Sequence, residues 1–219
     1  MSDRATIIGT TTWGTTLGIL LTQNNVSVTM LARTEAEANT LSVARRNNRF
    51  LPDAPFPERL TITGQPGIAL KKSDLVVIAV PSDRFRENIR RITPHLQPET
   101  IVLSATKGLE LPEARRMSQV LEDELPVELH SGICVLPGPN LAKEIVQGQP
   151  ASTVIAGQNY EAAQQAQDVL MSTNFRIYTS ADVLGVELAG ALKNIVALGA
   201  GIGDGMEAGE NAKAAFITR

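Results

Sequence analysis

The chain has 219 residues, of which 43% are hydrophobic and 20% charged, and its formal net charge is −3. This length has room for one large domain, or one and a half ordinary ones, with a buried core. The slight negative charge excludes an electrostatic footprint for nucleic acid. One cysteine, Cys134, and two histidines exclude an internal disulfide framework and a zinc cluster, so we expect no metal site.

The N-terminus shows no signal-peptide pattern, because Asp3 and Arg4 lead directly into an apolar run. The longest apolar stretches are short and interrupted by glycine, and we expect none of them to span a membrane. We therefore predict a soluble, cytoplasmic protein in which Cys134 is a small buried hydrophobe.

Residues 5–33 show the pattern of a strand, a tight turn, a helix and a second strand. The apolar run 5–8 predicts a buried strand that Gly9 ends. Apolar residues recur at helical spacing from Gly14, and strand character returns at 26–31. This order is typical of the first unit of a dinucleotide-binding fold, in which the turn faces a pyrophosphate.

Gly9 and Gly14 occupy two of the three glycine positions of the G-x-G-x-x-G pattern. Gly9 lets the chain leave the strand in a tight turn, and Gly14 lets the helix pack close to the sheet. Thr11 holds the middle position, so a Cβ lies where backbone N–H groups normally approach the pyrophosphate. With two glycines of three, an ordinary strand-turn-helix remains the alternative.

Arg33 stands where the second strand ends, at the position where an Asp or Glu binds the adenine ribose in NAD enzymes. A guanidinium there stacks on adenine and pairs with a 2′-phosphate, which favours NADP over NAD. The alternative is a solvated arginine at the entry to a helix.

The rest of the first 180 residues alternates between strand and helix patterns. We expect helices at 34–46, 113–124 and 159–171, and strands at 60–62, 75–80, 100–104, 132–136, 152–156 and 175–178. Three prolines predict an irregular connection over 47–57. The continuous apolar run 75–80 suits a parallel strand buried on both faces. The predicted fold class is therefore α/β, with a Rossmann-like doubly wound and mostly parallel sheet.

Ligands bind at the carboxyl ends of the strands of such a sheet, which places three further stretches near a cofactor. Phe85, beyond the strand at 75–80, either lies against the cofactor or belongs to the core. Lys107, just past the next strand, faces the same crevice or is an ordinary surface lysine. The turn 137–144 opens a helix whose free N–H groups would face a ligand.

Residues 182–198 are apolar nearly all round and predict a buried helix. Lys193 and Asn194 within it need partners, and burial would lower the pKa of Lys193, as a general base requires. We therefore prefer a catalytic role for Lys193 to a structural one. A glycine-rich break at 199–205 and a further helix start are expected to follow.

These stretches together resemble NAD(P)-dependent glycerol-3-phosphate dehydrogenase, over the whole chain. The most specific pieces are Ala105-Thr106-Lys107-Gly108-Leu109, Pro137-Gly138-Pro139-Asn140-Leu141-Ala142, Gly190-Ala191-Leu192-Lys193-Asn194 and Asn211 to Arg219. The resemblance implies a dinucleotide-binding Rossmann domain at 1–180 and the first helices of an all-α substrate domain at 181–219. In the family, that domain continues and carries the Arg and Asn that clamp the substrate phosphate. The chain is therefore expected to be a truncated product or part of a longer enzyme, with the apolar faces of residues 183–200 uncovered.

The resemblance also implies roles for single residues. Lys193 is the expected proton acceptor, Lys107 contacts substrate and cofactor, and Asn194 orients either lysine or the substrate. Substrate binding is expected at Lys107, Gly138, Asn140 and Lys193. The resemblance implies cofactor binding at Thr12, Trp13, Arg33, Lys107 and Ala142. The turn and strand-end patterns described above add Gly9, Thr11, Gly14 and Phe85 to the expected cofactor-binding residues.

The implied activity interconverts sn-glycerol 3-phosphate and dihydroxyacetone phosphate by hydride transfer with NADP, or with NAD, and feeds phospholipid biosynthesis. The expected partner is this small phosphorylated substrate, and a homodimer is left open. One alternative is a degenerate, non-catalytic nucleotide-binding module; Thr11 and the missing phosphate clamp favour it, whereas the intact Lys107, Lys193 and Asn194 argue against it. A second alternative is a related dehydrogenase that acts on a 2-hydroxy acid.

Overall fold

A computed structural model describes residues 4–138 and 140–218 of the chain, and an eight-stranded sheet forms its centre. In spatial order the strands are β12 (Phe175–Ser180), β11 (Ala151–Gly157), β10 (Ile133–Val135), β7 (Ile101–Ser104), β6 (Leu75–Ile78), β1 (Arg4–Ile8), β2 (Ser27–Leu31) and β5 (Leu60–Thr63). Neighbouring strands run parallel except β10 and β11, which are antiparallel. The predicted doubly wound, mostly parallel sheet is confirmed. Its strand order reverses at β1, the place where such sheets bind ligands.

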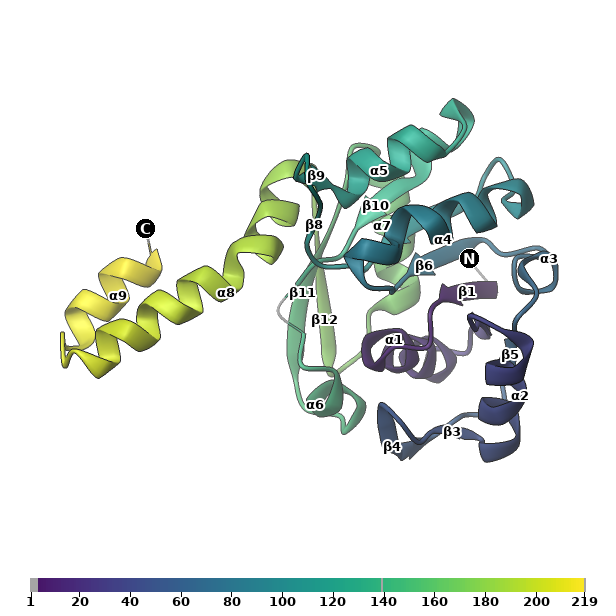
Figure 1. Ribbon diagram of the computed structural model, residues 1–219, viewed down its shortest axis with the longest axis horizontal. Coiled ribbons are helices and arrows are strands. Elements are labelled where there is room, and N and C mark those ends of the chain that lie inside the picture. The colour runs from purple at the N-terminus through teal and green to yellow at the C-terminus, as the bar shows by residue number, and fades with distance from the viewer. Residues whose placement is uncertain (1–3, 139, 219) are drawn as a thin grey trace.

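Helices cover both faces of this sheet (Figure 1). They are α1 (Thr12–Gln23), α2 (Glu35–Ala44), α3 (Pro66–Ala69), α4 (Phe85–Ile92), α5 (Met117–Glu124), α6 (Ala142–Val146), α7 (Tyr160–Leu170), α8 (Val183–Gly205) and α9 (Glu210–Thr218), with short 3₁₀ turns at Ser82–Arg84, Thr93–His95 and Val127–Gly132. Helix α1 packs with α6 and α7 on one side, and α4 packs with α5 on the other.

Two apolar cores result, one on each face of the sheet. In β1, Ile7 belongs to the core under α1 and α7, whereas Ile8 belongs to the core under α4 and α5. Val77 and Ile78 of β6 divide in the same way, because successive side chains of a strand point to opposite faces. Cys134 is fully buried in the first core, as predicted, and burial raises the pKa of its thiol to about 12.

The stretch 47–57 is not the irregular connection that its prolines predicted. Strand β3 (Arg46–Asn47) and strand β4 (Leu51–Pro55) form an antiparallel hairpin there. The pair belongs to no larger sheet, and proline is tolerated on such edge strands because few backbone N–H groups have to bond.

The helix predicted at 113–124 is also shorter than expected, because α5 begins only at Met117. Strand β8 (Leu109–Glu110) pairs antiparallel with β9 (Arg115–Arg116) just before it. This β8–β9 hairpin therefore joins the end of the Lys107 stretch to the first residue of α5.

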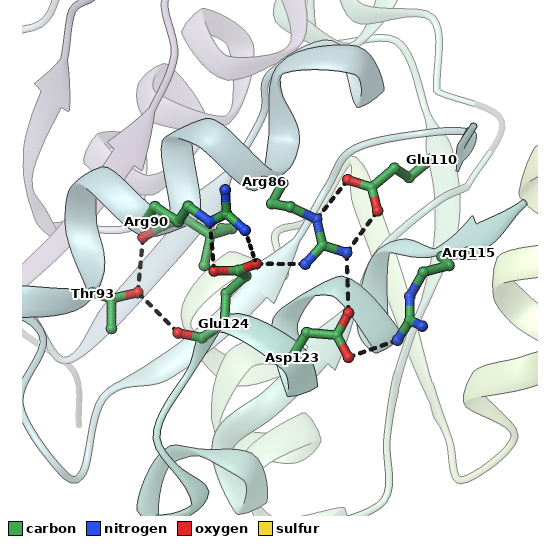
Figure 2. A network of polar contacts seen from close by, with 8 residues as sticks. Arg86, Arg90, Thr93, Glu110, Arg115, Asp123 and Glu124 are labelled. Atoms are coloured by element: carbon green, nitrogen blue, oxygen red, sulfur yellow. Dashed lines mark hydrogen bonds and ion pairs between the residues drawn. The ribbon is translucent and has the colours of Figure 1, made fainter. Parts of the chain in front are cut away.

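A cluster of charged side chains ties the hairpin to α4 and α5 (Figure 2). Arg86 on α4 donates to Glu110 on β8 at 2.6 and 2.8 Å, and on α5 to Glu124 at 2.5 Å and to Asp123 at 3.0 Å. Arg90 also donates twice to Glu124, at 2.8 and 2.9 Å. Hydrogen bonding from Arg86 lowers the pKa of Glu110, and hydrogen bonding from Arg90 and Arg86 lowers the pKa of Glu124.

Helix α8 differs most from its prediction. It extends away from the sheet and carries α9 at its far end (Figure 1). It runs unbroken through the glycines at 199–205, and the ring of Phe216 from α9 lies against Gly199, where a Cβ would collide with it. The predicted burial is wrong, since Ile195 and Leu198 are 64% and 67% exposed. The uncovered apolar faces expected over 183–200 are present.

Helix α8 is also the one helix, within the part of the chain that the structure describes, long and apolar enough to cross a membrane by length and composition. The apolar stretches were expected to be too short or too interrupted by glycine to cross a membrane. For α8 this expectation is wrong, because the glycines do not interrupt the helix. That the protein has no membrane span stays a prediction.

Candidate functional site

The turn after β1 has the tight geometry that its glycines predicted. Gly9 has a φ of +104°, and a Cβ there would lie 2.8 Å from the carbonyl oxygen of Ala79, so only glycine fits without strain. A Cβ on Gly14 would lie 2.5 Å from the Gly9 carbonyl oxygen and 3.3 Å from Cβ of Ala79. Helix α1 therefore packs directly against β1 and the end of β6.

Thr11, at the position of the missing glycine, is the N-cap of α1. Its Oγ1 accepts a hydrogen bond from the Gly14 amide at 3.1 Å and donates one to the Ala79 carbonyl at 2.8 Å. Its φ of −66° suits any L residue, so the backbone does not need glycine here. The first N–H groups of α1, those of Thr12 and Trp13, have no acceptor within the helix and lie at its positive end. The turn keeps the features that bind a phosphate.

A cleft of about 690 Å³ opens beside this turn, and Gly9, Thr11 and Arg33 line it. Arg33 is exposed, and Arg49 of the β3–β4 hairpin adds a second guanidinium to the lining. Glu37 of α2 accepts from the Arg33 amide at 3.0 Å and from the Thr10 hydroxyl at 2.5 Å, so its carboxylate joins the two strand ends. Sequence analysis missed Glu37 and Arg49; the first turn of α2 and the basic stretch around the hairpin were the available signals.

Two residues predicted to bind the cofactor, Trp13 and Phe85, differ in how deeply they are buried. Trp13 is partly buried, packs edge-on against Phe175 with ring centroids 6.3 Å apart, and has its Nε1 buried without a hydrogen-bond partner. Phe85 is fully buried in the core under α4 and α5. This burial agrees with the second of the two predicted alternatives, in which Phe85 belongs to the core, and the contact with a cofactor stays a prediction.

A second cleft, of about 390 Å³, lies where α8 crosses the turn after β10. Gly138, Thr153, Gly190 and Lys193 are among the residues that line it. A Cβ on Gly190 would lie 2.5 Å from Cβ of Pro137, so glycine lets the helix cross at close range. A Cβ on Gly138 would collide with the Thr153 side chain. Close packing of small residues thus brings Lys193 to the predicted substrate turn.

Lys193 and Lys107 come from different elements and are coupled electrostatically. Lys107 follows β7, and Lys193 lies on α8. Partial desolvation and the positive charge of Lys193 lower the pKa of Lys107. Lys193 itself is exposed, so its predicted burial is wrong; the apolar helix around it is uncovered. Asn194 is exposed too, and its side chain makes no hydrogen bond among the described residues.

Asn140 and Thr153 leave polar atoms unpaired in this region. Both polar side-chain atoms of Asn140 and Oγ1 of Thr153 are buried and have no hydrogen-bond partner among residues 4–138 and 140–218. Such atoms are costly to bury, so they mark a place where a polar ligand would be stabilised. Ala142 begins α6, and its carbonyl accepts from Oγ1 of Thr16 at 3.4 Å, which ties α6 to α1.

Comparison with known proteins covers both parts of the chain. The family model for the NAD-dependent glycerol-3-phosphate dehydrogenase N-terminus matches residues 4–163, and the model for its C-terminus matches residues 182–219. A glycerol-3-phosphate dehydrogenase (NAD(P)+) of Dehalococcoides mccartyi is 51% identical over 218 residues, 99% of this chain and 61% of the relative. One of Desulfitobacterium hafniense is 41% identical over 97% of this chain and 59% of the relative.

Solved structures give the same match. The crystal structure of glycerol-3-phosphate dehydrogenase from Coxiella burnetii superposes with a TM-score of 0.85 at 33% identity, over 99% of this chain and 66% of that chain. The chain thus spans about 60% of the length of the curated relatives described above.

Proposed function

Because the chain belongs to the NAD-dependent glycerol-3-phosphate dehydrogenase family, we propose that it interconverts sn-glycerol 3-phosphate and dihydroxyacetone phosphate with NAD(P). One observation carries the proposal. Lys193 of α8 lines the second cleft beside Gly138, and its charge contributes to the lowered pKa of Lys107, which follows β7. The close packing of Gly190 on Pro137 brings α8, and with it Lys193, to the turn that carries Gly138.

The residues that line the cleft of about 690 Å³ beside the Gly9 turn fit a dinucleotide. The turn at Gly9 leaves no room for a Cβ, and the N-terminus of α1 offers free N–H groups for the pyrophosphate. The unpaired Nε1 of Trp13 offers a further donor. We propose that Gly9, Thr11, Thr12, Trp13, Gly14 and Arg33 hold the cofactor, with Lys107 and Ala142 nearer its reactive end. Bound nicotinamide would supply the hydride exchange with C2 of the substrate.

The two lysines supply the proton chemistry and the electric field. Lys193 Nζ takes the proton of the C2 hydroxyl in oxidation and returns a proton to that oxygen in reduction. Partial burial, and then the nearby charge of Lys193, lower the pKa of Lys107. Lys107, when charged, stabilises negative charge on the substrate oxygen. The buried polar atoms of Asn140 offer a donor and an acceptor to the substrate's polar groups.

Two guanidinium groups in the lining of the cleft beside the Gly9 turn support a preference for NADP. Arg33 and Arg49 bring two guanidinium groups to the cleft, and a guanidinium pairs with a phosphate dianion better than with a ribose hydroxyl. We expect Arg33→Ala to weaken NADPH binding about tenfold or more and to leave NADH binding nearly unchanged. Fluorescence titration of the nicotinamide measures both constants; equal losses for the two cofactors would contradict the preference.

The activity is tested by following NADPH oxidation with dihydroxyacetone phosphate and, separately, with 2-keto acids. We expect turnover with the phosphorylated ketone and none with the keto acids. Lys193→Met should lower kcat by at least 100-fold while the Kd for NADPH stays unchanged, since it removes the proton acceptor and no proposed cofactor contact.

Lys71→Met is the matched control, because Lys71 is an exposed lysine in the segment between α3 and β6, before the amino end of that strand. It should leave kcat and KM as they are. Turnover of keto acids at a comparable rate, or full activity in Lys193→Met, would refute the proposed function.

The remaining expectations are also proposals. We infer a small phosphorylated substrate as the partner, a feed into phospholipid synthesis, and a cytoplasmic location in which α8 is covered by protein and not by lipid. Glu187 and Lys193 support this last inference, because charged groups are costly inside a bilayer.

A further inference from the structure

Glu187 is the buried residue of α8, a helix whose other residues are all at least partly exposed. Only 7% of Glu187 is exposed. Its Oε1 accepts from the Ser118 amide at 2.8 Å, and its Oε2 accepts from the Ser118 hydroxyl at 2.5 Å and from Nη1 of Arg116 at 2.8 Å. Three donors, one of them charged, thus hold a single carboxylate in place.

All three donors belong to the body of the Rossmann sheet. Ser118 lies in the first turn of α5, where the positive end of the helix favours an anion. Arg116 ends β9, and the β8–β9 hairpin begins two residues after Lys107. The ion pairs of Arg86 fix this hairpin and α5 to α4 (Figure 2). Glu187 is therefore bonded to the same rigid part of the structure that carries Lys107.

Helix geometry links this anchor to the catalytic lysine. Glu187, Gly190 and Lys193 follow at intervals of three residues, so each step turns the side-chain direction by about 60° around the helix axis. Gly190 faces Pro137, Glu187 lies on one flank of that contact, and Lys193 lies on the other, in the second cleft. Because both residues belong to one helix, the hydrogen bonds that hold Glu187 also set the direction in which Lys193 leaves the helix.

We propose that Glu187 is a positioning residue, whose bonds to Arg116 and Ser118 fix the rotation of α8 so that Lys193 faces Lys107. This inference rests on the proposed function, because it gives the orientation of Lys193 its purpose. Beyond Lys193 the helix leaves the body, where Ile195 and Leu198 are exposed (Figure 1). The orientation therefore has to be set by contacts that precede Lys193.

The test uses Lys107 as a reporter of where Lys193 lies. Lysines are labelled by reductive ¹³C-methylation, and the pKa of Lys107 is read from NMR titrations of the wild type, Lys193→Met, Glu187→Gln and the double variant. Lys193→Met removes the neighbouring charge, so it should raise the pKa of Lys107. Glu187→Gln should raise it by about the same amount, and the double variant should add nothing further.

Glu122→Gln is the control, because Glu122 is an exposed glutamate on α5. It should leave the Lys107 titration unchanged. Arg116→Gln is a milder second variant that keeps both Ser118 donors, and it should shift the Lys107 titration in the same direction. In turnover assays, Glu187→Gln should lower kcat at least tenfold with the Kd for NADPH unchanged; a merely structural role would lower the unfolding midpoint without moving the Lys107 titration.

The proposal is overturned if Lys193→Met raises the pKa of Lys107 but neither Glu187→Gln nor Arg116→Gln does. It is equally overturned if Lys193→Met has no effect, since the two lysines would then not face each other. A wild type that shows the coupled titration but no turnover of dihydroxyacetone phosphate would sink the proposed function and leave the positioning role of Glu187 intact.

Discussion

Thr11 gives the sharpest test of how the phosphate turn works. The sequence placed its Cβ in the path of the pyrophosphate, whereas the structure shows its hydroxyl capping α1 and bonding to Ala79. Three replacements separate the two effects. Thr11→Ala keeps Cβ and loses the hydroxyl, Thr11→Ser keeps the hydroxyl, and Thr11→Gly loses both.

The expected loss of stability follows from the two hydrogen bonds. An N-cap hydroxyl contributes about 1 kcal/mol, and the bond to the Ala79 carbonyl about another 0.5–1 kcal/mol. Thr11→Ala should therefore destabilise the protein by roughly 1.5–2 kcal/mol, which lowers the unfolding midpoint of a chain of this size by roughly 3–8 °C. Thr11→Ser should remain within about 0.5 kcal/mol of the wild type, because its hydroxyl keeps both bonds.

Thermal unfolding followed by circular dichroism measures the stability, and fluorescence titration measures NADPH binding. If Cβ obstructs the pyrophosphate, Thr11→Gly binds NADPH more tightly and Thr11→Ala does not. If the side chain acts as a cap alone, neither variant gains affinity, and this is the result we expect. Equal unfolding midpoints for wild type, Thr11→Ala and Thr11→Ser would refute the capping argument.

Three further predictions concern other parts of the fold. Glu110 and Glu124 have lowered pKa values, so their contribution to stability is full above about pH 4.3 and is lost as the pH falls through their folded-state pKa values. Arg86→Met removes their hydrogen-bond donor, so it should cost less unfolding free energy at acid pH than at neutral pH. Urea unfolding of the wild type and the variant at several pH values measures this difference. Cys134, buried and with a thiol pKa of about 12, should react with a thiol reagent at pH 8 only on unfolding, and rapid labelling of the native protein would contradict its burial. Gly190→Leu should force α8 off Pro137 and abolish turnover while the Kd for NADPH stays the same; unchanged turnover would show that the close crossing is not needed.

The sheet could be predicted from sequence because its signals are local. Runs such as 75–80 are apolar at every position, and a strand buried on both faces is what such a run can satisfy. The roles of Gly9 and Gly14 were equally accessible, since a turn and a close helix contact each require the absence of a Cβ. The hairpins at 46–55 and 109–116 were missed, because their short strands are fixed by tertiary contacts and not by alternation.

Burial on the cofactor side was harder to predict than secondary structure. Phe85 follows a strand on the ligand side, and residue type alone cannot tell a ring that faces a cofactor from one that fills a core. The helical period decides it only once α4 is placed against α5, which buries Phe85, Ile89 and Ile92 on one side. Arg33, by contrast, is an exposed residue just beyond the buried end of β2, where the change from strand to helix pattern predicts a surface position.

Helix α8 shows why the choice between its two charged residues could not be made from the pattern. A lysine in an apolar helix was expected to be the buried group that needs partners, yet Glu187 is buried and bonded while Lys193 is exposed. Both residues lie in the same apolar sequence, so the pattern treats them alike. What separates them is the rotation of the helix against the body, which Ser118 and Arg116 fix from about 70 positions earlier in the chain. Lys193 can therefore stay exposed at the cleft, because Glu187 makes the buried contact instead.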